Sequence, residues 1–418
     1  MALVPLEDAR RHVLERAAVL SPVSLSASDC AELVLAADLV AGEDVPPFAN
    51  TSMDGYAVQS SDTAGASDDR PVSLAVAGSI AAGAPPEPPV GPGQAVRIMT
   101  GAPIPPGADA VVMVERTEPD GPERVRILAP AEPGLNVRPA GDDIGRGQTV
   151  FAAGTALTPA HLGVAASLGA IELEVHRRPR VGVLSTGDEL VDGPAPLRPG
   201  QIRESNRALL LGLTAQLGCV AVDLGIARDT ETEIDAAITA AVGSCDVVLT
   251  SGGVSVGDFD YVKVVLDRLS GGEMRWMQVA VRPAKPFAFG LVGHTPVFGL
   301  PGNPVSAGIS FELFARPALR QMMGHVGPAR FRPRISAVAE EGWRGGRDDR
   351  TSFYRASARI RPDGRVGLRG AGGQGSHMLS ALARANALAV VGPGAEIGEG
   401  ADVEAWLLGE PLPAETSA

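Results

Sequence analysis

Acidic residues follow three consecutive predicted strands of this 418-residue chain. Asp188 and Glu189 come after RVGVLST, Asp229 comes after CVAVDLGIA, and Asp258 and Asp260 come after CDVVLTSGG. Because the carboxyl ends of parallel strands form the ligand crevice of an α/β domain, we expect these acids at one edge. Carboxylates there could hold Mg²⁺ and bridge it to substrate phosphates. The alternative interpretation of each acid is an ordinary turn former or helix cap.

A glycine pair closes the third of these strands. Gly252 and Gly253 allow close approach of a ligand to the backbone, and their N–H groups could cradle an anion. The same segment matches GxSxG, the pattern around a nucleophilic serine, with Ser255 at its centre. No lipase-type oxyanion motif accompanies it. An anion cradle, a plain glycine-rich turn and, least favoured, a serine hydrolase therefore remain as interpretations.

Lysine is rare in this chain. Of 36 lysines and arginines only two are lysines, Lys263 and Lys285. Lys285 lies in VRPAKPFAF, close to Arg282. The Lys ammonium is a compact point charge, whereas the Arg guanidinium is a planar fork. A lysine kept at this position indicates a narrow anion site, and the alternative is a surface cation kept by chance.

Another apolar strand ends in GLPGNP, which contains Pro301 and Pro304. Two prolines and a glycine around an asparagine make a rigid loop. Such a loop is either a stiff turn or a fixed wall for a small ligand.

Apolar patterning predicts the elements that position these residues. Between residues 180 and 328, strands alternate with helices and indicate a largely parallel sheet covered on both faces. Residues 46–146 carry short β runs among many glycines and prolines, which indicates a β-rich module. Past residue 328 the pattern predicts a small all-β domain.

Three helices are predicted outside the α/β domain. The first covers residues 5–20, and the second covers CAELVLAADLVA after a cap at Ser28 or Asp29. The third begins at Thr158, where TPAHLGVAASLG has proline at its first helical position.

The composition excludes several classes of partner. A net charge of −13 argues against a polyanion binder, and 4% aromatic residues argue against stacking on single-stranded nucleic acid. The N-terminus has no apolar signal region, and the longest apolar tract is interrupted by polar residues, so no membrane association is expected. Three widely spaced cysteines fit a reducing cytoplasm better than a disulfide framework or a zinc site.

Eight motifs occur in one order: SMDGYAV, MTGAPIPPGADAVV, VRPAGDDI, LSTGDEL, SGGVSVGDFDYVK, RPAKPFAFG, GLPGNPVSA and GQGSHML. Together, from about Pro5 to Trp406, the chain resembles the MoeA family of molybdopterin molybdenumtransferases, and also the E domain of gephyrin. The resemblance implies a linker domain (1–45 and 147–177), a β-rich inserted domain (46–146), a MogA-like molybdopterin-binding α/β domain (178–328) and a C-terminal β-barrel (329–418).

The resemblance also implies an activity. It is the transfer of molybdate onto adenylated molybdopterin, with Mg²⁺ as cofactor and release of AMP, in a cytoplasmic homodimer that a MogA-type adenylyltransferase supplies. The alternatives are an adenylyltransferase-like activity of the chain itself and a gephyrin-like scaffold that binds receptor peptides.

Motif by motif, the resemblance implies roles for individual residues. The residues implied in catalysis are Asp54, Thr100, Glu189, Asp229, Asp260 and Lys285. Those implied in binding adenylated molybdopterin are Arg138, Asp143, Gly252, Gly253, Ser255, Pro301 and Pro304. Those implied in binding molybdate are Arg282, Lys285, Arg355 and Ser376, and those implied in binding Mg²⁺ are Glu189, Asp229 and Asp260. The family often carries KPxKP where this chain has Arg282-Pro-Ala-Lys285-Pro, so one of the two lysines is an arginine here.

Overall fold

The computed structural model describes residues 2–253 and 261–414. Two compact units make up the chain. The α/β–barrel unit comprises Met1–Ser24, Glu32–Ala36 and Glu174–Ala418, and the inserted unit comprises Leu25–Ala31 and Ala37–Leu173. The multidomain α/β plus β fold class is confirmed, whereas the four domain boundaries given above stay a prediction. No helix in the described part of the chain is long and apolar enough to cross a membrane.

The α/β–barrel unit contains a six-stranded sheet in the order β17-β14-β18-β22-β21-β19. The strands β14, β17, β18 and β22 run parallel, and β21 and β19 run antiparallel to their neighbours. This confirms the largely parallel sheet. The bounds are β14 (Arg180–Thr186), β17 (Val220–Ala227), β18 (Val247–Ser251), β19 (Arg275–Gln278), β21 (Pro286–Val292) and β22 (Thr295–Leu300).

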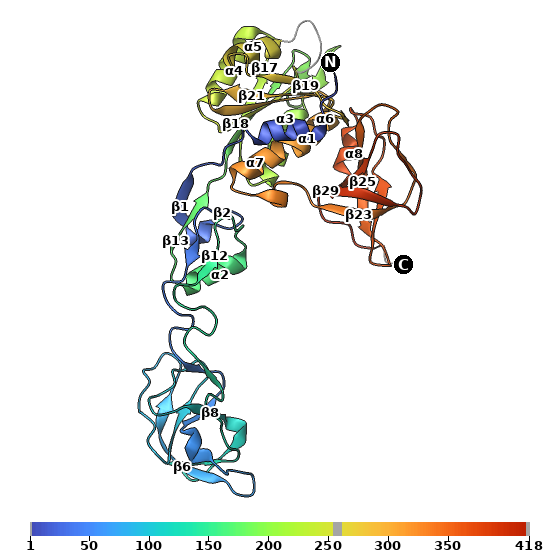
Figure 1. Cartoon of the computed structure of the whole chain (residues 1–418). Coiled ribbons are helices and arrows are strands. Elements are labelled where there is room, and N and C mark those ends of the chain that lie inside the picture. The colour runs from blue at the N-terminus through green and yellow to red at the C-terminus, as the bar shows by residue number, and fades with distance from the viewer. Residues whose placement is uncertain (1, 254–260, 415–418) are drawn as a thin grey trace. The chain divides into compact units, whose positions relative to one another are not determined.

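Helices cover both faces of this sheet, because successive side chains of its strands alternate between two cores. In β18, Val247 and Leu249 join one core and Val248 joins the other. On the Val248 side pack α4 (Glu231–Val242) and α5 (Tyr261–Leu269). The other side is covered by α1 (Leu6–Leu14), α3 (Asn206–Gln216), α6 (Pro304–Ser310) and α7 (Arg316–Met322). Figure 1 shows the two sets of helices.

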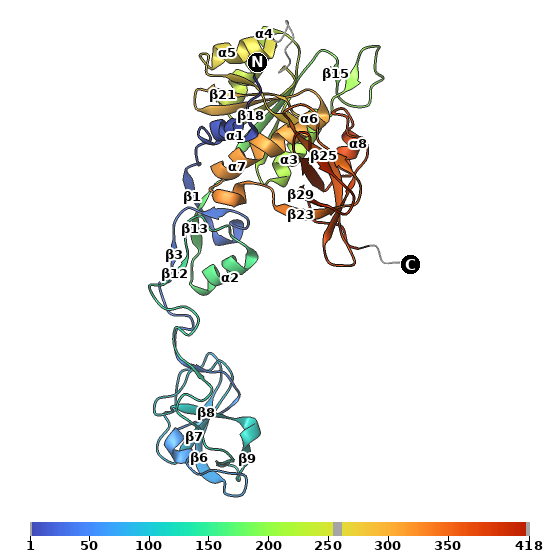
Figure 2. The ribbon, with the colours of Figure 1, turned by 45° about the vertical axis from the view of Figure 1, so that its right-hand side comes forward.

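The C-terminal part of the same unit is a closed barrel of five strands. The order is β25-β26-β23-β29-β27, and β27 pairs back onto β25. Seven of the eleven buried residues in its core are alanines, among them Ala337, Ala356 and Ala389. The bounds are β23 (Arg334–Ala339), β25 (Thr351–Ile360), β26 (Val366–Gly370), β27 (Ala387–Val391) and β29 (Asp402–Leu407), and Figure 2 shows this barrel beside α8 (Leu379–Ala383).

The inserted unit is built around a six-stranded sheet in the order β8-β5-β7-β6-β10-β9. Its side chains alternate between two small cores: in β8, Val111 faces one core and Val112 the other. The β-rich inserted module is therefore confirmed. The bounds are β5 (Gly55–Val58), β6 (Val72–Ile80), β7 (Gln94–Ile98), β8 (Ala110–Met113), β9 (Thr117–Pro119) and β10 (Arg124–Ile127).

One helix prediction was wrong. The segment CAELVLAADLVA contains β2 (Val34–Leu35) and β3 (Leu39–Val40) instead of a helix. Long-range pairing explains the difference: β2 pairs with β13 (Glu172–His176), and β3 pairs with β12 (Thr149–Phe151). Tertiary context thus overrides the local helical pattern.

The other two predicted helices are present. The helix at Thr158 is confirmed as α2 (Pro159–Ser167), with Pro159 first and a Thr158–His161 capping box. The first predicted helix is present but shorter than expected, since α1 ends at Leu14.

Candidate functional site

Three of the five acids predicted at the carboxyl edge of the parallel sheet lie close together, and the other two, Asp258 and Asp260, are outside the described residues. Asp188 and Glu189 follow β14, and Asp229 follows β17. The backbone N–H of Asp229 donates to Asp188 Oδ1 at 3.2 Å. Burial raises the pKa of Asp229, and the negative charges of Asp188 and Glu189 raise it further. This edge of the sheet therefore favours a bound cation or proton.

A metal centre made of protein groups alone is not apparent there. Among residues 2–253 and 261–414, no group of three His, Cys, Asp or Glu side chains is placed to hold a metal ion. Asp260, the third acid predicted for Mg²⁺, lies outside the described residues, as does Ser255. Mg²⁺ commonly uses one or two carboxylates together with waters and substrate phosphates, so the chemistry of Glu189 and Asp229 fits it.

The glycine turn after β18 passes very close to its neighbour β14. A Cβ on Gly252 would lie 2.9 Å from both Thr186 O and Thr186 Oγ1, and Gly252 has φ +101°. Its N–H donates to Leu300 O at 3.1 Å, which joins the ends of β18 and β22. Gly253 also has a positive φ, of 67°. Position 252 therefore requires glycine, because a Cβ would be too close to Thr186 and because the backbone has a positive φ.

The GLPGNP loop follows β22 and leads directly into α6. Pro304 is the first residue of α6, the helical position where the missing N–H of proline costs nothing. Pro301 is buried, and the N–H of Val305 donates to Ser376 O at 3.1 Å. The first turn of α6, directly after this loop, therefore contacts the GQGSHML turn.

Arg355 is a buried cation whose hydrogen-bonding groups are only partly satisfied. It lies on β25 and is 1% exposed. Its Nη2 donates to Gly373 O at 2.8 Å and Gly375 O at 3.2 Å, whereas its buried Nε has no hydrogen-bond partner. No carboxylate pairs with Arg355 within the described residues, and burial lowers its pKa. A buried cation without a counter-charge is costly, so an anion beside it would be strongly favoured.

Arg282 and Lys285 occupy a tight loop beside the barrel. Here β20 (Val281–Arg282) pairs in parallel with β25, with Arg282 opposite Ser352. Arg282 Nη2 donates to Asp348 Oδ2 at 2.8 Å. The loop is closed by the Val279 N–H, which donates to Lys285 O at 2.7 Å.

The Lys285 side chain differs from that of Arg282. It is exposed and makes no ion pair or hydrogen bond with the part of the chain that the structure describes. Arg282, Arg355 and the Ser376 turn are connected through β25. The structure thus gathers these predicted anion-binding positions around one strand and leaves the Lys285 ammonium available.

The inserted unit brings together a second group of predicted residues. Thr100 donates to Asp54 Oδ1 through its N–H and its hydroxyl, both at 2.7 Å. These two hydrogen bonds lower the pKa of Asp54. A Cβ on Gly55 would lie 2.0 Å from Val112 O, which explains the glycine of MDGY. Asp54 is thus fixed as an exposed carboxylate.

Arg138 and Asp143 lie in the segment of the inserted unit that follows its six-stranded sheet. Arg138, in β11 (Val137–Arg138), is opposite Asn50 of β4 (Asn50–Thr51), four residues before Asp54. The N–H of Asp143 donates to Val45 O at 3.0 Å. Both side chains are exposed.

Sequence reasoning missed the residues that connect the loops of the sheet edge. Asn206 donates through Nδ2 to Ser251 Oγ at 2.7 Å and to Gly302 O at 2.6 Å. The Glu204 side chain is 3% exposed, and its carboxylate accepts from Ser185 Oγ at 3.0 Å. The only signal in the sequence is the polar run ESNR at the start of the predicted helix SNRALLLGLTAQLG, and helix capping explains such a run equally well.

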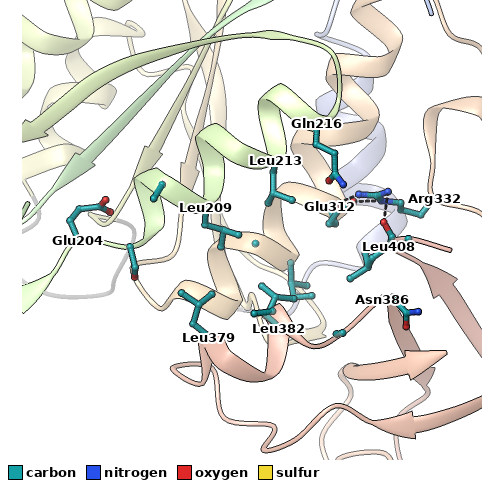
Figure 3. A pocket seen from close by; sticks show the side chains of 17 residues that line it. Glu204, Leu209, Leu213, Gln216, Glu312, Arg332, Leu379, Leu382, Asn386 and Leu408 are labelled. Carbon is teal, nitrogen blue, oxygen red and sulfur yellow. Dashed lines mark hydrogen bonds and ion pairs between the residues drawn. The ribbon is translucent and has the colours of Figure 1, made fainter. Parts of the chain in front are cut away.

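A separate apolar pocket of about 640 Å³ lies between α3, α6, α8 and the barrel (Figure 3). Leucines dominate its lining, and at one end Arg332 Nη2 pairs with Glu312 Oε1 at 2.8 Å. None of the described residues predicted for the site lines this pocket. The lining leucines are Leu209, Leu213, Leu379, Leu382 and Leu408.

Three family models match successive parts of the chain. They are the MoeA N-terminal region (domain I and II) over residues 4–169, a probable molybdopterin binding domain over 182–321, and the MoeA C-terminal region (domain IV) over 337–408. The resemblance drawn from the motifs is thereby confirmed.

Individual proteins match over almost their whole length. The molybdopterin molybdenumtransferase of Haemophilus influenzae is 37% identical over 93% of this chain and 94% of its own. Molybdopterin molybdenumtransferase 2 of Mycobacterium tuberculosis is 39% identical over 96% of this chain and 98% of its own.

A solved structure of the molybdopterin biosynthesis MoeA protein from Pyrococcus horikoshii has a TM-score of 0.83 at 31% identity and covers 98% of this chain and 100% of that chain. A further solved structure, titled as a molybdopterin biosynthesis MoeA protein from Pyrococcus horikoshii OT3, has a TM-score of 0.82 at 27% identity and covers 97% of this chain and 100% of that chain. Motifs, fold and relatives agree along the length of the sequence, and the chain belongs to the MoeA family.

Proposed function

We propose that this chain transfers molybdate onto adenylated molybdopterin, releasing AMP and giving the molybdenum cofactor. The observation that carries the proposal is Arg355, a buried guanidinium without a carboxylate partner among the described residues, next to the turn that contains Ser376. A small oxyanion bound beside it would supply the missing counter-charge. The names of the relatives, molybdopterin molybdenumtransferase, support molybdate as this oxyanion.

Lys285, Arg282 and Arg355 would each contribute differently to binding the anion. Lys285 is exposed and uncommitted within the described residues, so its ammonium is free to contact molybdate. Arg282 is already paired with Asp348 and would act mainly through its charge. Arg355 and the Ser376 hydroxyl would complete the site, and catalysis would consist largely of positioning and charge neutralisation.

The adenylated pterin would lie along the carboxyl edge of the sheet. Gly252 and Gly253 offer close backbone approach to its phosphates, and the loop from Pro301 to Pro304 gives a rigid wall. Glu189 and Asp229, with Asp260, would hold Mg²⁺, which when bound neutralises negative charge on the phosphates. The raised pKa of Asp229 fits a carboxylate that gains stability from a nearby cation.

We propose that Asp54, Thr100, Arg138 and Asp143 also serve the reaction, and that the chain works as a cytoplasmic homodimer. A MogA-type adenylyltransferase would be the partner that delivers adenylated molybdopterin. The fixed, exposed Asp54 carboxylate supports a role in contact with a ligand rather than in the core of its own unit.

The test is an incubation of the purified chain with adenylated molybdopterin, Mg²⁺ and molybdate, followed by quantification of AMP. We expect AMP release that depends on molybdate, and strong loss of that release in Lys285→Ala. ATP-dependent adenylation of molybdopterin without molybdate-dependent AMP release would identify an adenylyltransferase instead. Binding of a receptor peptide with neither reaction would identify a scaffold.

A further inference from the structure

A single side chain joins the two loops that close the parallel strands β18 and β22. Asn206, the first residue of α3, is 9% exposed. Its Nδ2 donates one hydrogen bond to Ser251 Oγ at 2.7 Å and one to Gly302 O at 2.6 Å. Both amide protons are therefore used, one toward the glycine turn and one toward the GLPGNP loop.

The neighbours of Asn206 hold it in this orientation. Glu204 Oε1 accepts from the Arg207 N–H at 2.7 Å and from Ser185 Oγ in β14 at 3.0 Å. Arg207 Nη1 pairs with Asp223 of β17 at 2.6 Å. Residues 204–207 thus contact β14, β17, β18 and the loop that follows β22. Asn206 therefore has little freedom to move.

The two loops are close enough for this contact to set their spacing. A Cβ on Gly302 would lie 3.8 Å from the Gly252 Cα, and the Gly252 N–H donates to Leu300 O at 3.1 Å. Ser251 is 2% exposed, so loss of Asn206 would leave its hydroxyl buried without this partner. Restoring a partner would require one of the loops to shift.

We propose that Asn206 is a positioning residue whose carboxamide fixes the separation between the Gly252–Gly253 turn and the Pro301–Pro304 loop, and so orients the phosphate-bearing substrate between them. This inference rests on the proposed function. Asparagine suits the task because it offers two donors without a charge. Aspartate has the same shape but no donors, and it would place a negative charge beside Glu204 and the substrate phosphates.

The test compares Asn206→Leu and Asn206→Asp with a matched control, Asn386→Leu. Asn386 also donates two hydrogen bonds from Nδ2, to Ala358 O at 3.0 Å and to Glu410 O at 2.8 Å, but in the barrel. All variants are assayed for AMP release from adenylated molybdopterin, well below their unfolding temperatures. A displacement of about 1 Å can cost roughly a hundredfold in rate.

We expect kcat to fall between about tenfold and a hundredfold in both Asn206 variants, with KM changing far less. Asn386→Leu should lose comparable stability and keep its kcat. In a double-mutant cycle, Ser251→Ala should add little to Asn206→Leu, because the two changes remove the same contact. A normal kcat in both Asn206 variants, or an equal loss in Asn386→Leu, would overturn the inference.

Hydrogen–deuterium exchange separates this inference from the proposed function. If the unmodified chain releases no AMP, the proposed function fails, and exchange at the Gly252 amide then decides whether Asn206 sets the spacing of the loops. We expect faster exchange at Gly252 in Asn206→Leu than in Asn386→Leu. Equal exchange in the two variants would refute the positioning role.

Discussion

Exchanging lysine and arginine at two neighbouring positions should have unequal effects. Lys285→Arg keeps the charge but replaces a compact ammonium by a longer planar fork. Because the Lys285 side chain is exposed and has no partner among the described residues, stability should change by less than about 0.5 kcal/mol. The guanidinium should nevertheless displace the bound anion, and a shift near 1 Å corresponds to roughly a hundredfold loss in rate.

Arg282→Lys is the matched control for this change. It restores the double-lysine pattern of the family and removes one charge-assisted hydrogen bond to Asp348, which Arg350 also contacts. The Arg282–Asp348 pair is partly exposed and screened, so its loss should matter little. We expect near-normal AMP release from this variant.

The assay measures initial AMP release against molybdate concentration for both variants, with thermal unfolding recorded in parallel. A hundredfold loss corresponds to about 2.7 kcal/mol of transition-state stabilisation. Equal, near-normal rates for Lys285→Arg and Arg282→Lys would refute the assignment of Lys285 to the anion site. A large fall in the unfolding temperature of Lys285→Arg would instead show a structural role.

Three further predictions concern the two units separately. Gly252→Ala should lower the free energy of unfolding by at least about 1–3 kcal/mol in urea titrations, since φ is +101° and the new Cβ would meet Thr186 O at 2.9 Å; an unchanged midpoint would contradict this. The pKa of Asp229 is raised in the folded state, so ionisation of its carboxyl lowers the stability of the fold as the pH rises through that pKa. Asp229→Asn should therefore raise the unfolding temperature at pH 7 but not below about pH 4. A gain in unfolding temperature that is independent of pH would count against the carboxylate cluster. Thr100→Val removes one hydrogen bond to Asp54 and should raise the pKa of Asp54 in a carboxyl NMR titration, whereas an unmoved titration would show that the hydroxyl does not act on it.

The carboxyl edge of the sheet could be predicted because its signals are local. Each of β14, β17 and β18 is a short apolar run that ends at a turn, and parallel strands place such turns side by side. The same logic located Gly252 and the GLPGNP loop.

Contacts between distant segments could not be predicted in this way. Asn206 bonds residues 45 and 96 positions away, and a polar residue at a helix start has a sufficient local explanation as a cap. The segment at residues 30–41 read as a helix because its apolar spacing is helical, while β13 and β12, which pair with it, are far along the chain. The burial of Arg355 was equally invisible, since its surroundings come from the GQGSHML turn.

The most direct test of the account is to locate the anion itself. Crystals of the chain soaked with molybdate can be measured at the molybdenum absorption edge, where anomalous scattering marks the metal. We expect one strong peak in contact with Lys285, Arg355 and Ser376, and loss of that peak in Lys285→Ala crystals. A peak that lies elsewhere, or that persists in Lys285→Ala, would contradict the proposed anion site.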